Sequence, residues 1–544
     1  MKNWPPILYG SSLHARFSTP LVLSFLIVLT FLSTGLGRTP GLSQAANPFQ
    51  SITLNNRTIS TKEYLNQAWE LKIRAGLTSN SGFAWDPAAR EWKLKYPLSE
   101  EAQKAIAHYA SWTATASRVG INVASAYGEL DKFDELAKFY SLFLKTYFTT
   151  VGELQKVKAP EIKSKLLEPE SGQGSSRTLA WYWKQPDGSI ILRECDQCNA
   201  EYFFPAARLI RGIAELKPKE RTPAMGQFVT EYVPLIVKEH ILRLNFAERM
   251  RADMTPGGPY FKKRVMNADE LFDIASAAEL LGAGSLDSKL VVLSEEDRLK
   301  LKDLVHVGVD RLQFSQTLTK DTSGRICASY FNGDYDQIED MAYARYEGEG
   351  FPTPAQKAKP RGVSWDISHF SLIPMFLWSL YENHHATGVH FPERADIEQI
   401  GNQYALRVFE GDYEKPLFKN FFDGSDGWFR VSYLGRSNYG IAPSRFCNTA
   451  DPSHGCTTIA GIYSWGLLAS IDPDIARVQT ALIDLARSND SSIACFESRC
   501  FRERYYRYAD ISFSFLDAGG DTQYPPALIV VLSELALSFS QPSR

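Results

Sequence analysis

Apolar residues recur at helical spacing along most of the chain, and this periodicity is the strongest signal in the sequence. A capping box over Ser60–Glu63 is expected to start the first helix, because a serine followed three residues later by a glutamate satisfies the free N–H groups of a helix start. Strand signals are few: residues 181–193 have the pattern of a hairpin that turns at Pro186-Asp-Gly188, and residues 428–433 that of a single strand. The periodicity predicts further helices near residues 99–125, 129–157, 200–216, 226–250, 267–283, 294–319, 366–387, 394–410, 457–470, 473–488 and 525–540.

Two kinds of helix are distinguishable by pattern. Residues 370–380 and 527–537 are apolar nearly all round, whereas residues 474–487 and 295–307 alternate charged with apolar positions. A helix that is apolar all round must be buried on every side, and inner helices enclosed by outer ones provide that environment. We therefore expect an all-α fold, an (α/α) toroid of helical hairpins of the six-hairpin type with short β-hairpins at its rim. No repeat of fixed period is evident, so an irregular helical bundle is the alternative.

Prolines and glycines add local detail. Pro525 and Pro526 fit a helix start, where a missing N–H costs nothing. Gly388 is placed to end the 366–387 helix as a left-handed cap, and Pro374 is expected to kink that helix.

The first residues have the pattern of a secretory signal. Lys2 and Arg16 precede an apolar run over 20–32, and small residues around Ala45 suit cleavage, so residues 1–45 are interpreted as a signal peptide; an uncleaved anchor is the alternative. Residues 46–544 would then form one large domain. Removal of residues 1–45 moves the formal net charge from −3 to −6. An exported, mildly acidic chain is not expected to bind nucleic acid, and it would contact a membrane only through an uncleaved N-terminal segment.

Seven cysteines in an exported chain favour disulfides. Three close pairs could each close a small ring, and Cys327 would remain unpaired. Zinc or redox chemistry at the C-x-x-C pair is the alternative, although neither two further ligands nor a thioredoxin-like context follows. The candidate disulfide cysteines are Cys195, Cys198, Cys447, Cys456, Cys495 and Cys500.

The segment 362–369 brings an acid, a base and an aromatic ring to a helix start. Asp366 and His369 are three residues apart and share a helix face, so the carboxylate can orient the imidazole as a general base. The alternative is that Asp366 caps the helix and His369 is a hydrogen-bonded core residue. Trp365 lies beside the pair as a candidate substrate contact.

A glycine-rich segment follows about fifty residues on. In the functional interpretation, Trp428 stacks on a sugar, an arginine neutralises a uronate carboxylate and a tyrosine donates a proton. In the alternative, the Asp-Gly pairs are turn residues and the arginine and tyrosine pair structurally. The candidate residues here are Asp423, Asp426, Trp428, Arg430, Tyr433 and Arg436.

Glu339 and Asp340 belong to a third acidic cluster that could supply acid and base at the edge of the cleft, or could cap helices. The glycine in this cluster is wrongly placed for an EF-hand, so no metal site is predicted. An Arg/Tyr patch over residues 499–508 suits an anionic polysaccharide or a structural Arg/Tyr network.

An exported helical chain with an aromatic-lined acidic cleft resembles the (α/α)-toroid polysaccharide lyases and glycosidases. This resemblance is architectural, covers about residues 60–540, and matches no catalytic motif. It implies an enzyme acting on a polysaccharide or oligosaccharide, including anionic ones, without a cofactor. Two reactions suit the cleft: β-elimination, with His369 or Tyr433 removing a proton, or hydrolysis between two carboxylates. A non-catalytic envelope scaffold that binds a glycan or a protein is the alternative from another class.

Overall fold

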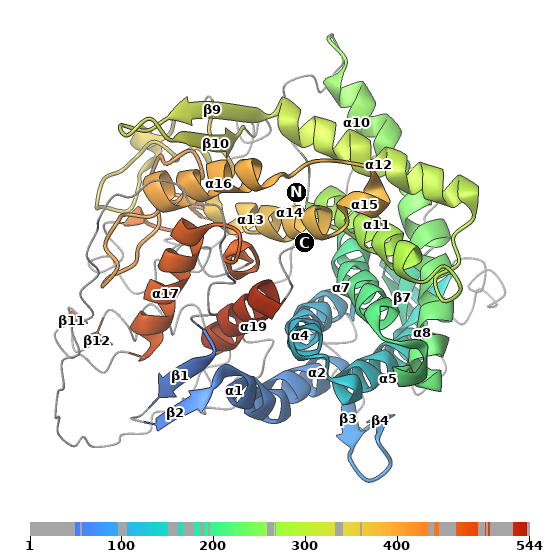
Figure 1. Ribbon diagram of the computed structural model, residues 1–544. Coiled ribbons are helices and arrows are strands. Elements are labelled where there is room, and N and C mark those ends of the chain that lie inside the picture. The colour runs from blue at the N-terminus through green and yellow to red at the C-terminus, as the bar shows by residue number, and fades with distance from the viewer. Residues whose placement is uncertain are drawn as a thin grey trace, which may run out of the picture. The chain divides into compact units, whose positions relative to one another are not determined.

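The protein is mostly helical, with small β-sheets (Figure 1). The computed structural model describes residues 49–54, 57–95, 106–150, 162–166, 179–184, 190–193, 196–257, 266, 268–331, 341–358, 362–432, 440–444, 464–487, 495–496, 499–500 and 526–540. The signal segment 1–45 lies outside these residues. Among the described helices, none is both long enough and apolar enough to cross a membrane.

Six segments, which we call the core helices, contact one another in a closed series. Each packs against the next, and α19 returns to pack against α4 (Figure 1). Their described side chains are almost all buried, as the all-round apolar pattern of residues 370–380 and 527–537 predicts. The core helices are α4 (Ile106–Tyr127), α7 (Asp196–Glu215), α11 (Ala268–Leu286), α14 (Leu372–Glu382), η12 (Trp465–Leu468) and α19 (Pro526–Ser540).

Helices with one polar face pack against the core helices. Among them, α2 packs on α4, α5 packs on α4 and α7, α12 packs on α11, and α17 packs on η12 and α19. The helical segments other than the core helices are α1 (Thr61–Ala68), η1 (Trp69–Ile73), α2 (Arg74–Ser81), α5 (Leu130–Tyr147), η3 (Pro218–Glu220), α8 (Pro223–Pro234), η4 (Leu235–Ile241), α9 (Leu242–Leu244), α10 (Phe246–Met254), α12 (Glu295–Phe314), η7 (Pro354–Gln356), α13 (Ile367–Phe370), α15 (His384–Thr387), α16 (Arg394–Gln403), η8 (Tyr404–Val408) and α17 (Pro473–Arg487).

The connections between these helices are of two kinds. Short stretches follow α4, α7, α11, α15 and η12, at residues 128–129, 216–222, 287–294, 388–393 and 469–472. Longer connections precede α4, α7, α11, α13, η12 and α19, at residues 95–105, 148–195, 255–267, 315–366, 409–464 and 488–525, and many of their residues lie outside the described ones. Short connections favour antiparallel neighbours, and connecting segments commonly carry binding and catalytic residues.

The strands form small sheets within and around these connections. A four-stranded sheet has the order β5 (Phe148–Thr150), β7 (Leu179–Lys184), β8 (Ile190–Arg193), β6 (Ile162–Leu166), in which β6 and β8 are parallel. The predicted hairpin over residues 181–193 is its β7–β8 pair. Antiparallel pairs join β1 (Ser51–Leu54) to β2 (Arg57–Ser60), β3 (Phe83–Asp86) to β4 (Glu91–Leu94), β9 (Gln316–Lys320) to β10 (Ile326–Tyr330), and β11 (Cys495–Phe496) to β12 (Arg499–Cys500).

Several predicted boundaries are confirmed and others are wrong. Ser60 caps α1 by accepting a hydrogen bond from Glu63 N, and Gly388 ends α15 in the left-handed conformation with φ +76°. The helix predicted over 129–157 ends at Tyr147, where β5 begins, and the one over 294–319 ends at Phe314, before β9. Helical spacing continued past both ends because the following strand residues are also partly apolar.

The helix predicted over 366–387 consists of α13, α14 and α15, with its first break at Ser371 rather than at Pro374. Pro374 lies in the first turn of α14, where the backbone N–H groups have no helical partner in any case. A proline ring clashes with the carbonyl of the residue four positions earlier, here Phe370, and that residue is the last of α13. The proline therefore sets the break one turn before itself.

Candidate functional site

Asp366 and His369 form a hydrogen-bonded pair at the N-terminus of α13. Asp366 is fully buried, and its Oδ2 lies 2.6 Å from His369 Nδ1 while its Oδ1 accepts the backbone N–H of His369 at 3.1 Å. Asp366 pairs with Phe421 in a β-bridge, and the next backbone N–H, that of Ile367, donates to Asn420 O, so the backbone around Asp366 is fixed. The His369 side chain is 42% exposed. A buried carboxylate thus fixes the orientation of an imidazole whose outer edge reaches solvent.

Arg430 lies against the outer nitrogen of the same imidazole. Its Nη2 is 3.2 Å from His369 Nε2. Because a guanidinium can only donate hydrogen bonds, Nε2 must accept here, and Nδ1 carries the proton that it donates to Asp366. His369 is consequently held in one neutral tautomer with its lone pair directed at a cation.

The backbone of Arg430 is in the left-handed region, with φ +56°. An arginine pays about 1 kcal/mol or more for that conformation, and such residues are concentrated at sites where the surrounding structure imposes the strain. The guanidinium also lies 4.9 Å from the centre of the Phe429 ring, and Phe429 pairs with Ile441 through a β-bridge. These contacts fix the position of Arg430, so the loop holds its guanidinium against His369.

The two carboxylates of the glycine-rich segment accept hydrogen bonds from their own loop and from the segments packed against it. Asp423 Oδ1 accepts the backbone and hydroxyl groups of Ser425, and its Oδ2 accepts Ser364 N at 3.2 Å. Asp426 accepts bonds from the backbone of Asn420 and Gly427 and from Ser444. Burial raises the pKa of Asp426 from its usual value, against the opposing effect of these donors. These contacts match the turn interpretation, and they leave Asp426 without a free oxygen for acid/base work.

The tryptophans do not provide the exposed ring faces that sugar stacking requires. Trp428 is fully buried: its indole N–H donates to Gly348 O at 2.7 Å and its ring packs edge-on against Phe351. Trp365 is 3% exposed. The stacking role expected for Trp428 and the substrate contact expected for Trp365 do not fit this burial. The strand predicted over residues 428–433 is wrong for the described residues 428–432, which form an irregular segment with Trp428, Phe429 and Val431 buried.

Several candidates lie outside the described residues, namely Glu339, Asp340, Tyr433, Arg436, Cys195, Cys447 and Cys456. Cys327 is free and buried, as expected. Cys198 is buried and disulfide-bonded, with its partner outside the described side chains, so its pairing stays a prediction. Cys495 and Cys500 stand directly opposite each other in the β11–β12 pair.

A pocket of about 340 Å³ is lined by Gly362 and Ser364 of the segment 362–369, by Asp423, and otherwise by residues that the sequence did not single out. We call it the ribbon pocket, because the β9–β10 hairpin forms one of its walls. The alternating threonines of β9 were an available signal, but the helical spacing extends the predicted 294–319 helix over them. The pocket is lined by Thr317, Thr319, Ser329, Tyr330, Phe331, Gly362, Ser364, Gln403, Arg407 and Asp423.

A second group that sequence reasoning missed is a buried charge cluster on the core helices. Glu279 of α11 lies 3.8 Å from Arg208 Nε and 3.7 Å from Arg211 Nε, both on α7. Glu534 of α19 is 1% exposed, and burial raises its pKa to about 8 although Arg118 and Arg208 oppose the shift. We call Arg118, Arg208, Arg211, Glu279 and Glu534 the core charges. A charged residue on an apolar helix is visible in sequence, but its partners on other helices are not.

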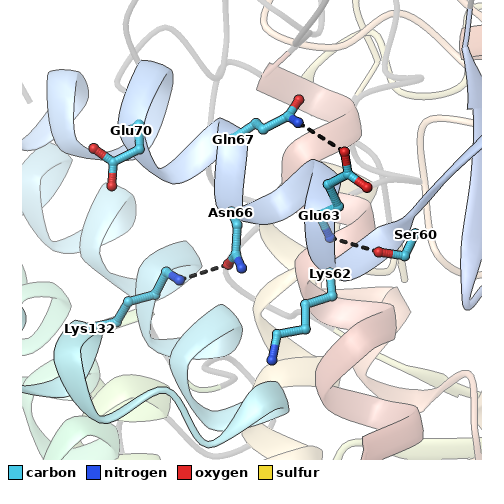
Figure 2. Close-up of a pocket in the computed structure, with 7 residues that line it drawn as sticks. All are labelled: Ser60, Lys62, Glu63, Asn66, Gln67, Glu70 and Lys132. Carbon is cyan, nitrogen blue, oxygen red and sulfur yellow. Dashed lines mark hydrogen bonds between the residues drawn. The ribbon is translucent and has the colours of Figure 1, made fainter.

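A second pocket, of about 590 Å³, is an open hollow lined mainly by α1, with Glu70 of η1 and Lys132 of α5 (Figure 2). Its polar groups bond to one another: Lys132 donates to Asn66 at 2.7 Å, and Gln67 to Glu63 at 3.3 Å. None of the predicted site residues lines it. The polar groups of this hollow already have protein partners, and we assign it no function.

Within the described part of the chain, no group of three or more histidine, cysteine or acidic side chains could hold a metal ion. No protein-family model matches the chain, and comparisons with curated proteins and with solved structures found no similar protein.

Proposed function

We propose that this protein is an exported polysaccharide-active enzyme, a lyase that cleaves uronate-containing chains by β-elimination with His369 as the base. The observation that carries the proposal is the solvent-facing imidazole of His369, which is fixed by buried Asp366 and capped by the Arg430 guanidinium. A base and a cation a hydrogen bond apart are what proton abstraction beside a carboxylate requires.

We also propose that the helices form an (α/α) toroid. The closed series of contacts among the core helices supports it, as does the packing of α2, α5, α12 and α17 outside them. In such an arrangement the N-termini of the core helices share one end, and the long connections gather there. Asp366, His369 and Arg430 all belong to those long connections or to the helix start that follows one.

The elimination would use the site in the following way. A substrate carboxylate competes with His369 for the Arg430 guanidinium, and bidentate pairing with the carboxylate is the stronger interaction. His369 Nε2 is thereby released and takes the proton from the carbon next to the carboxylate. The electron pair of that C–H bond forms the new C=C bond, and the glycosidic oxygen leaves with its bonding pair and takes a proton from a donor. Arg430 stabilises the negative charge that develops on the carboxylate, and Tyr433 is the predicted proton donor.

Hydrolysis between two carboxylates is less well supported. Asp366 is buried beside His369, and the Asp423 and Asp426 carboxylates accept hydrogen bonds from backbone N–H groups, including those of Ser364 and Ser444. A glycosidase needs one carboxylic acid and one carboxylate free to face the glycosidic bond. The binding-scaffold alternative predicts that Asp366 and His369 are both buried. Asp366 is buried, but the 42% exposure of the His369 side chain disfavours this alternative.

The test is to incubate purified protein with uronate-containing and neutral polysaccharides while following the ultraviolet absorbance of unsaturated ends and the reducing sugar in parallel. The proposal predicts that both signals rise together on a uronate polymer and disappear in His369→Ala. New reducing ends without ultraviolet absorbance would show that the protein is a hydrolase rather than a lyase. No signal with any polysaccharide would favour the binding scaffold.

A further inference from the structure

The ribbon pocket has three polar walls, one of which is a face of the β9–β10 hairpin. In the antiparallel register Thr317 stands opposite Ser329 and Thr319 opposite Cys327, and opposed residues share a face of the ribbon. Thr317 and Thr319 are two residues apart and therefore point to the same side. This wall presents three hydroxyl groups to the pocket, from Thr317, Thr319 and Ser329.

The second wall carries a positioned cation and an amide. Gln403 and Arg407 are four residues apart and lie on one side of the helical segment that runs from α16 into η8. Arg407 Nη2 donates to Lys320 O at 2.9 Å, and Gln403 Nε2 donates to Phe422 O at 2.6 Å. η8 is a π-helical turn, a distortion that is frequent at functional sites.

The third wall joins the pocket to the candidate site. Ser364 N donates to Asp423 Oδ2, and one residue further along each segment Phe422 N donates to Trp365 O at 2.9 Å. Asp366 follows Ser364 by two positions in this paired stretch, which corresponds to roughly 7 Å of extended backbone. The pocket and the Asp366–His369 pair therefore lie at successive positions along one paired strand.

The charges in the pocket balance, since Arg407 contributes one positive charge and Asp423 one negative charge. A guanidinium and a carboxylate with several hydroxyls and an amide match the alternating donors and acceptors of neighbouring sugar hydroxyls better than they match an ion. A volume of about 340 Å³ is at the lower end of the range for small-ligand sites.

We infer that the ribbon pocket is a subsite that binds one sugar ring of the substrate through adjacent hydroxyl groups, next to the ring on which His369 acts. This inference rests on the proposed function and adds to it a binding site for a ring that does not react. Arg407 and Asp423 hold two adjacent hydroxyls, while Thr317, Thr319 and Ser329 contact the remaining edge of the ring.

The experiment measures sugar binding independently of catalysis. Methyl glycosides of neutral and uronate sugars are titrated into the full-length protein and followed by ligand-observed NMR, for wild type, Arg407→Gln, Thr319→Val and the control Thr230→Val. Thr230 is an exposed threonine of α8 whose hydroxyl donates to Gly226 O, far along the chain from the pocket. We expect at least tenfold weaker binding in Arg407→Gln, a smaller loss in Thr319→Val, and wild-type binding in Thr230→Val.

The outcomes separate the subsite from the reaction. Equal binding by wild type, Arg407→Gln and Thr319→Val would overturn the subsite, as would no binding of any glycoside by wild type, even if polysaccharide is still cleaved. Glycoside binding that is weakened by the pocket variants, without cleavage of any polymer, would instead support the subsite and rule out the proposed lyase activity. Circular dichroism of Arg407→Gln checks that the variant is folded, and Thr319→Val, at an exposed strand position, tests the pocket if it is not.

Discussion

The core charges and the candidate site use the same kinds of side chain in opposite settings. Glu279 meets Arg208 and Arg211 in the interior of packed helices, and Glu279 also accepts the Ser379 hydroxyl at 2.7 Å. In the site, Asp366 bonds to one nitrogen of His369 at the start of a helix, and Arg430 contacts the other nitrogen of the ring, which is half open to solvent. Both groups combine a buried carboxylate with arginine, but only the second leaves a polar edge for a ligand.

This difference shows that the position of a charged residue in the fold, rather than its type, decides whether it only stabilises the structure or is available to a ligand. Buried pairs between regular helices have fixed geometry and no access, so removing one partner leaves an uncompensated charge. A charge at the end of a long connection has access, and its loss costs little stability. Each variant below tests one side of this comparison, beginning with the largest expected effect.

The first variant concerns Glu534. Because the pKa of this carboxyl is raised in the folded protein, the stability of the fold should fall as the pH rises. A carboxyl with a folded pKa of about 8 and an ordinary value of 4.5 contributes its full share of stability below pH 4.5. That share is lost as the pH rises through 8. Glu534→Gln should therefore match wild type at pH 4 and exceed its unfolding free energy at pH 9, by up to about 5 kcal/mol at 1.4 kcal/mol per pKa unit. Urea unfolding across this pH range measures it, and parallel curves would show that the pKa of Glu534 does not differ between the folded and unfolded states.

The second breaks the core charges directly. Glu279→Ala removes the shared partner of Arg208 and Arg211 and should destabilise the protein by about 3–5 kcal/mol in urea unfolding. The matched control is Glu215→Ala, which removes a partly exposed partner 3.0 Å from Arg211 and should cost under about 1 kcal/mol. Similar costs for the two variants would erase the distinction between buried and peripheral pairs.

The third addresses the site. His369→Gln should lower kcat on the uronate polymer by about 100-fold or more, because a positioned base contributes that much. Its unfolding free energy should stay within about 0.5 kcal/mol of wild type, since the imidazole is partly exposed. A parallel loss of stability and activity would make His369 a structural residue.

The smallest effect separates backbone strain from charge at Arg430. Arg430→Gly and Arg430→Ala both remove the guanidinium and should lose activity equally. Glycine relieves the left-handed backbone and should make its variant about 1 kcal/mol more stable than the alanine variant. Thermal unfolding of the two proteins side by side measures this, and equal stability would mean that the loop relaxes when the arginine is lost.

Sequence periodicity could predict the helical class and much of the core, because a segment that is apolar all round, such as residues 527–537, must be buried on every side. It also predicted the pairing of Asp366 with His369, since a three-residue spacing is local. It could not predict the burial of Trp428 or the partnership of Glu279 with Arg208, because both depend on packing between segments far apart in the chain. The ribbon pocket was missed for the same reason: its walls come from three separate stretches.

The packing of α19 on α4 has a consequence for how the chain acquires its structure. Asn122 and Ser533 contact each other at 3.5 Å across this interface, although 411 positions separate them in sequence. The apolar face of α4 therefore stays uncovered until residues 526–540 have been synthesised and have docked, so the interior closes late. A chain clipped before residue 526 would expose that face, and we expect it to aggregate or to be degraded rather than to fold into a smaller working unit.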